Sequence, residues 1–215
     1  MVSVKQGVMN MNGNIMDGDS ISNAEILEMP NPLGSMPANL SVIPEDMDMH
    51  MTMIDVMYAP SKDLTLMMMG TYVSKDMTLN TYAAMMDRNL LGKFSTSSSD
   101  LSELTFSVLG NLHDTDNSKW HGEATLQKSI GTNDDTDQVL TPMGTEMNMI
   151  LPYAMQASDK GTRLVLGLTN SRKLSDKTSW TNQARYNKVM YKKDWAFGDL
   201  VELYSWVQHQ YQPYL

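Results

Sequence analysis

Residues 45–72 read EDMDMHMTMIDVMYAPSKDLTLMMMGTY, and this stretch decides the fold class. Side chains of different polarity alternate at every second position on both sides of Pro60. Successive side chains of an extended strand point to opposite faces, so a period of two is typical of β-strands. The stretch therefore predicts two antiparallel strands, 46–58 and 63–74, joined as a hairpin across 59–62.

The same period recurs along the chain. In the segment 119–130, polar side chains occupy one face and apolar side chains occupy almost all of the other. Comparable segments lie at 2–12, 101–112, 162–173, 178–190 and 197–209. They are longer than ordinary strands of ~5–6 residues and match the ~9–11 residues that a tilted strand needs to cross a bilayer.

The expected connections alternate in length. Three are long, at 13–45, 75–100 and 131–161, and three are short, at 59–62, 113–118 and 174–177. This alternation is typical of barrels in the bacterial outer membrane. We predict an all-β, antiparallel, up-and-down outer-membrane β-barrel that forms one domain over 1–215. Its eight or so strands either close a small barrel or form most of a larger one.

Composition excludes several classes of protein. The formal net charge is −9, which disfavours a nucleic-acid partner. The chain has no Cys, so disulfides, thiolate metal sites and a Cys nucleophile are excluded. The sequence contains no run of 18 apolar residues, so it predicts no membrane-spanning helix. We find no nucleophile elbow, HExxH, P-loop or dinucleotide fingerprint and therefore expect no enzyme.

Several segments resemble one family. The stretch 45–72, MNGNIMDGDSIS at 11–22, LSELTFSVLGNL at 101–112, MILPYAMQ at 149–156 and GTRLVLGLT at 161–169 are similar to bacterial outer-membrane proteins labelled "putative meta-pathway of phenol degradation" and called transporters. The resemblance runs over nearly the whole chain. It implies a transport barrel and supplies no catalytic residue. Without a signal peptide or a terminal aromatic strand, we expect the barrel to be incomplete at both ends.

Methionine is unusually frequent, with 22 Met against 3 Phe. If the short turn pairs Tyr58 with Leu64, one face of the hairpin gathers a row of methionines around Asp55: Met47, Met49, Met51, Met53, Met67 and Met69. The opposite face carries Ile54, Val56, Leu64 and Leu66, which suit lipid. We therefore expect the methionine row and Asp55 to line the lumen, where Asp55 meets water or a basic side chain across the barrel.

Two interpretations of the methionine row stay open. Thioethers are soft ligands that can hold Cu(I), so copper is the one metal that the row predicts, and no other cofactor is expected. Alternatively, methionine is a flexible apolar filler of an adaptable interior. His50 lies on the opposite face, which weakens a joint site. We expect structural or solvated roles for His113, His121 and His209 and for the acidic tract 134–137. For Trp120, Trp180, Trp195 and Trp206 we expect positions in an interfacial girdle.

The function expected from these patterns is an outer-membrane channel that transports small aromatic or apolar molecules. A methionine-rich barrel that handles copper is the alternative, and a plugged structural or receptor barrel is the second alternative. The expected partners are the lipid bilayer of the bacterial outer membrane and a small-molecule solute.

Overall fold

The computed structural model describes residues 1–211 except 33, 35, 86 and 87. Strands make up 68% of the chain and helix 3%, so the all-β prediction is confirmed. The strands are β1 (Val2–Asn12), β2 (Asn14–Met16), β3 (Asp19–Ile21), β4 (Val42–Tyr58), β5 (Leu64–Tyr82), β6 (Leu90–Asp114), β7 (Ser118–Ser129), β8 (Thr136–Leu140), β9 (Glu146–Ile150), β10 (Thr162–Ser175), β11 (Thr178–Tyr191) and β12 (Leu200–His209). The described residues also form a helix, α1 (Asn23–Glu28).

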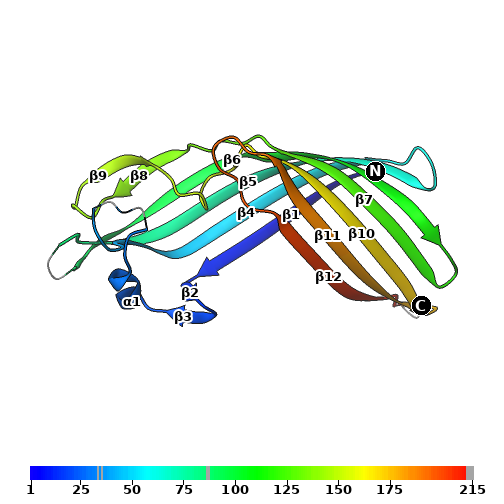
Figure 1. Ribbon diagram of the computed structural model, residues 1–215, viewed down its shortest axis with the longest axis horizontal. Coiled ribbons are helices and arrows are strands. Elements are labelled where there is room, and N and C mark those ends of the chain that lie inside the picture. Colours follow the sequence, from blue (N-terminus) through cyan, green and yellow to red (C-terminus); the bar gives the residue numbers. More distant parts are fainter. Residues whose placement is uncertain (33, 35, 86–87, 212–215) are drawn as a thin grey trace.

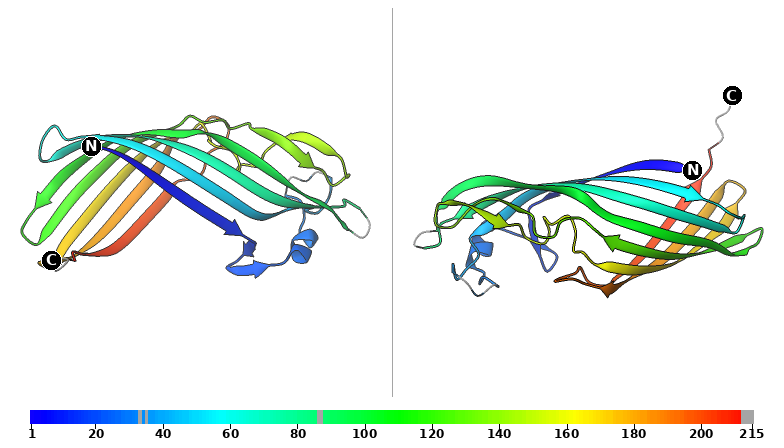
Figure 2. Two further views of the ribbon diagram at one scale, coloured as in Figure 1. Left: turned by 180° about the vertical axis from the view of Figure 1, so that it is seen from behind. Right: turned by 90° about the horizontal axis from the view of Figure 1, so that it is seen from above.

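Eight long strands form one antiparallel sheet in the order β1-β4-β5-β6-β7-β10-β11-β12. The sheet curls along its length into a half-barrel (Figures 1 and 2). The N-terminus, the end of β12 and the short turns lie at one end of the sheet, and α1 with the hairpins β2–β3 and β8–β9 lies at the other (Figure 1). Within the described part of the chain, the outward edges of β1 and β12 have no strand partner.

The predicted hairpin of β4 and β5 is confirmed, but its register differs from the expected one. Tyr58 pairs with Leu66, two residues beyond Leu64. A shift of two residues equals one full period of the strand, so it exchanges partners and leaves every side chain on its face. Asp55 consequently faces the same side as the methionine row and lies opposite Met69.

The prediction of a long connection over 75–100 is wrong. Strand β5 continues to Tyr82 and β6 begins at Leu90, so the serine tract 95–99 lies inside a strand. These extensions hold polar residues on the convex face and mainly buried side chains on the concave face. The serines resembled a loop because the polar row here faces water. The other long connections also contain short elements: α1, for example, begins at a capping box in which Ser22 and Glu25 bond reciprocally.

The two faces of the sheet have opposite character over most of its width. On the convex face of β5, the side chains of Met68 and Tyr72 are 54% and 46% exposed, and exposed apolar residues continue across the neighbouring strands: Ile54, Val56, Phe106, Val108, Leu126, Leu166, Leu168, Val201 and Leu203. The concave face buries polar residues such as Thr105, Ser107 and Thr125. This polarity is the reverse of that of a sheet that covers an apolar core.

The character of both faces changes after Tyr72. The convex side chains of β5 are then Ser74, Asp76, Thr78 and Asn80, whereas the concave ones are Val73, Lys75, Met77, Leu79 and Thr81, all buried. Strand β6 changes in the same way beyond Leu101, where its convex face becomes Ser99, Ser97 and Ser95. The apolar convex surface therefore ends along a boundary that crosses adjacent strands.

Engineered cysteines test the register of β4 and β5 in this Cys-free chain. Val56 and Met68 are direct partners, so their Cα atoms should lie about 4.5–5.5 Å apart, within disulfide range. We expect the double variant Val56→Cys, Met68→Cys to cross-link under mild oxidation, as measured by a mobility shift on non-reducing gels. The control pair Val56→Cys, Leu66→Cys corresponds to the expected but unobserved register, a diagonal of about 7–8 Å. Preferential cross-linking of that control pair would contradict the register.

Candidate functional site on the concave face

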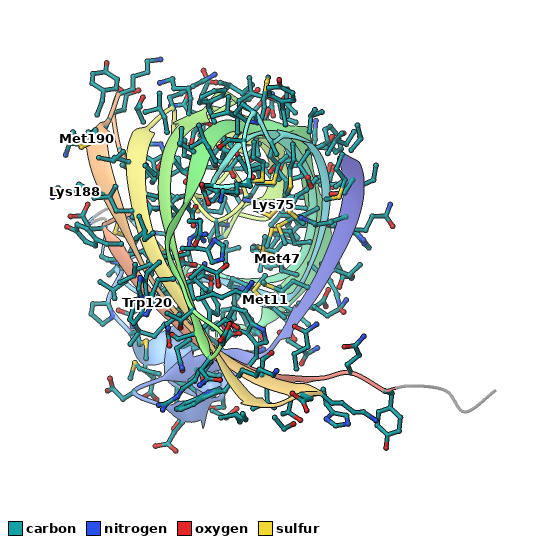
Figure 3. All side chains as sticks on the ribbon, turned by 90° about the vertical axis from the view of Figure 1, so that its right-hand side faces the viewer. Met11, Met47, Lys75, Trp120, Lys188 and Met190 are labelled. Carbon is teal, nitrogen blue, oxygen red and sulfur yellow. The ribbon has the colours of Figure 1, made fainter. Side chains whose placement is uncertain are left out.

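The methionine row and Asp55 lie on the concave face of β4 and β5. Figure 3, which looks along the strands, shows Met11 and Met47 inside the curve of the sheet and Lys188 and Met190 on its outer side. Asp55 is fully buried and accepts hydrogen bonds from Ser3 and from Lys5 Nζ, the latter at 3.2 Å. Its basic partner therefore comes from the adjacent strand β1 and not from across the lumen.

The register separates the expected methionines into two groups. Met67 and Met69 lie opposite Met57 and Asp55, whereas Met47 lies far along β4, opposite Met77. Met47 belongs to an apolar cluster with Met77, Leu79, Leu151 and Met155. Met49, Met51 and Met53 lie between the two groups, opposite Lys75, Val73 and Thr71. The six methionines thus line one wall of the concave face without forming one cluster.

In the described part of the chain, no cluster of acidic or imidazole side chains complements the methionine sulfurs as metal ligands. Among the described residues, no group of three or more His, Cys, Asp or Glu side chains is placed to hold a metal ion. His50 lies on the convex face, opposite Ser74. Copper binding by the methionine sulfurs stays a prediction.

A segment that we call the inner loop, residues 151–161, fills the concave face at the end of the sheet distant from the termini. Lys75 Nζ donates to the carbonyl oxygens of Ala154 and Gln156, each at 2.7 Å, and Ser98 Oγ donates to the carbonyl of Met155. Met155 is fully buried. Because Lys75 and Ser98 lie on β5 and β6, the inner loop crosses the interior of the curve beside the methionine wall (Figure 3).

An ion pair anchors the other end of the inner loop. Arg163 of β10 forms a bidentate pair with Asp159, and both side chains are buried. Asp159 also accepts from the backbone N–H groups of Gly161 at 2.9 Å and Phe197 at 3.1 Å. Burial alone would raise the pKa of Asp159, but these hydrogen bonds and the guanidinium hold that pKa below its usual value. The carboxylate therefore ties the inner loop to β10 and to the connection that precedes β12.

A charged triad spans four strands in the middle of the concave face. Arg185 of β11 donates to Glu123 of β7 at 3.0 and 3.2 Å and to Glu202 of β12 at 3.2 Å. Strand β10 lies between β7 and β11, and its residue at this level is Gly167. A Cβ atom there would lie 2.9 Å from a carboxylate oxygen of Glu123. The glycine therefore leaves the space through which Arg185 reaches across a whole strand.

A groove of about 260 Å³ lies between the triad and the methionine wall. Met67, Met69 and Leu200 supply its apolar lining. Its polar lining comes from β6, β7, β11 and β12: Glu103, Thr105, Ser107, Glu123, Thr125, Gln127, Arg185, Asn187 and Glu202. The groove is accordingly amphipathic, with polarizable sulfur on one side and carboxylates on the other.

The tryptophans do not form one girdle. Trp120 and Trp180 are exposed on the convex face, as expected. Trp195 instead packs between Tyr153 and Phe197, with ring centroids 4.6 and 5.1 Å away. Trp206 lies opposite Thr181, in the row that faces the concave side. For these two residues the girdle prediction is wrong, because one is in a loop and the parity of the other points inward.

Sequence reasoning missed Lys75, Arg163 and Arg185. All three occupy concave positions of strands, and a charged residue at a position that alternation assigns to the interior was the available signal. Their partners could not be inferred, because each lies on a loop or on a strand fixed only by the tertiary fold.

No family model matches this chain, and a search of curated proteins finds no match either. In the described residues, no helix is long and apolar enough to cross a membrane.

Removing the anchor of the inner loop should destabilise the protein. The variant Asp159→Ala leaves buried Arg163 without its carboxylate, which typically costs about 3–5 kcal/mol. We expect a lower urea midpoint, measured by tryptophan fluorescence. Because the pKa of Asp159 is lowered, this contribution is present above the usual aspartate range and is lost as pH falls through the lowered value.

The matched control for this variant is Asp176→Ala, which breaks the exposed ion pair with Lys173. Exposed pairs contribute little, so the control should leave the midpoint nearly unchanged. Equal midpoints for the two variants would show that the Asp159 pair does not anchor the loop.

Proposed function

We propose that this protein is a β-barrel of the bacterial outer membrane that passes small molecules along its concave face. The observation that carries the proposal is the boundary after Tyr72 and Leu101, where the convex face changes from exposed apolar to polar side chains. A protein surrounded by water on its whole convex side has no reason for such a boundary. Strands that extend from a hydrocarbon layer into water need such a boundary where the layer ends, and aromatic residues are favoured at that level.

The height of the apolar surface supports a lipid layer. Along β5 it runs from Leu64 to Tyr72, about 26 Å at a rise of about 3.3 Å per residue. A strand tilt of about 40° reduces this to roughly 20 Å, close to the ~25 Å apolar band of outer-membrane barrels. The polar extensions of β5 and β6 would then project beyond the membrane.

The concave face supports the passage of solutes. It combines buried hydroxyls, paired charges and a methionine wall, which suit small polar and apolar groups. The resemblance of 45–72 to transporters of the phenol meta-pathway label favours the same function and a small aromatic or apolar solute. The inner loop, however, fills one end of the interior, and this observation favours a plugged receptor as the second candidate.

Arginine substitutions on the convex face of β6 test the membrane assignment. Phe106 is 52% exposed within the apolar surface, and Ser97 is exposed beyond it on the same face. In lipid, arginine near the midplane costs about 2–4 kcal/mol, whereas in water either exposed position changes stability by roughly 0.5 kcal/mol or less. We expect Phe106→Arg, and not Ser97→Arg, to lower the yield of protein folded into liposomes. Equal yields for both variants would refute the lipid-facing surface.

A swelling assay with proteoliposomes tests the channel. We expect liposomes that contain the full-length protein to swell faster than empty liposomes in an isotonic solution of a small solute, because an open interior admits it. Faster swelling in Lys75→Met, which removes both hydrogen bonds to the inner loop, would identify that loop as the constriction. Insertion without swelling in either protein would reject the channel and favour the plugged receptor.

A further inference from the structure

The groove between the methionine wall and the charged triad contains an imbalance of charge. Its lining has three carboxylates, Glu103, Glu123 and Glu202, against the single guanidinium of Arg185. Arg185 is already shared by Glu123 and Glu202. Within the described residues, Glu103 forms no ion pair, and the side chain that contacts it is the neutral amide of Gln127. Glu103 therefore places a carboxyl group in the groove that has no ion-pair partner among the described residues.

Two further polar atoms of the groove lack hydrogen-bond partners. Thr105 is 6% exposed, and its Oγ has no partner in the described part of the chain. The side-chain oxygen of Asn187 is likewise buried without a donor, although the amide nitrogen contacts Gln127 at 3.4 Å. Buried polar atoms are normally satisfied, because a buried polar atom without a partner loses the hydrogen bonds that it made with water. Both oxygens, like Glu103, can accept a hydrogen bond from a donor in the groove.

The side of the groove opposite the carboxylates suits an apolar group. Met67 and Met69 of β5 lie opposite Ser107 and Thr105 of β6, so the sulfurs adjoin the hydroxyl groups of the polar lining. Leu200 of β12, opposite Asn187, adds a third apolar side chain from the far side of the groove. Methionine packs well against aromatic rings and adapts to irregular shapes. A bare metal cation or a small ammonium ion would leave this apolar lining without a partner.

We propose that this groove binds a small organic ammonium with an apolar, aromatic body. The ammonium donates to Glu103 and to the unpartnered oxygens of Thr105 and Asn187, and the body packs on Met67, Met69 and Leu200. The groove's volume of about 260 Å³ suits a molecule of the size of an arylalkylamine. This inference deepens the proposed function and rests on it, because it names the class of solute that the concave face would select.

Isothermal titration of the full-length protein in a non-ionic detergent tests the site with three probes at constant ionic strength. Phenethylamine carries both the ammonium and the ring, 2-phenylethanol keeps the ring without the charge, and ethylamine keeps the charge without the ring. We expect phenethylamine to bind at least tenfold more tightly than either other probe. Absence of phenethylamine binding, or equal affinity for 2-phenylethanol, would overturn the proposal. Displacement of phenethylamine by millimolar calcium would reassign the groove to inorganic cations.

Variants of the groove separate the charge from the fold. Glu103→Gln keeps the shape and should weaken phenethylamine at least tenfold while leaving 2-phenylethanol unchanged. Thr105→Val, which is similar in shape, should weaken phenethylamine about threefold and keeps the test valid if the first variant does not fold. Glu146→Gln, on the exposed hairpin β8–β9, is the matched control and should bind as the parent does. Unchanged phenethylamine affinity in both groove variants would refute the site.

The binding test and the arginine test fail independently. Titration in detergent measures the groove whether or not the convex face meets lipid. A Phe106→Arg defect without phenethylamine binding would remove only the ammonium site. Phenethylamine binding without any difference between the two arginine variants would keep the groove and remove the membrane channel.

Discussion

Every feature of this molecule depends on the alternation of side chains along an extended strand. Each long strand contributes one row to the convex face and one row to the concave face, so a single sequence specifies two surfaces at once. In β5 the row that contains Met68 and Tyr72 meets the outside, and the row that contains Met69 and Thr71 meets the interior. The methionine wall, the triad and the groove all arise from the concave rows of successive strands.

This dependence on parity explains which predictions succeeded. The hairpin of β4 and β5 and the faces of its residues depend only on odd and even positions, so they survived a two-residue difference in register. The extents of β5 and β6 were missed because the sense of alternation reverses after Tyr72, and exposed serines resemble a loop. The inner loop was invisible because its contacts are remote: Lys75 and Ala154 are separated by 79 positions. No local pattern contains such information.

The concave face reconciles buried charge with stability by pairing. Asp159 accepts hydrogen bonds from Arg163 and from two backbone N–H groups. Gly167 has no side chain and so leaves room for Arg185 to contact Glu123. A buried charge that is paired in this way is tolerated, whereas one without a partner is expensive. Glu103 departs from this pattern, because its carboxyl group contacts the neutral amide of Gln127 and forms no ion pair among the described residues. An acidic group without a charged partner in a groove is a place to look for a ligand.

The free edges of β1 and β12 have a consequence for how such a sheet enters a membrane. Each edge presents a row of backbone N–H and C=O groups that no described strand pairs. In hydrocarbon, every unpaired backbone group costs several kcal/mol, so a row of them on a ten-residue strand such as β12 outweighs the burial of its apolar side chains. If the convex face meets lipid, the edges cannot enter first and find partners afterwards. Pairing of the two edges, whichever strands supply the partners, and insertion are then one cooperative transition, and a sheet with open edges belongs to the aqueous side alone.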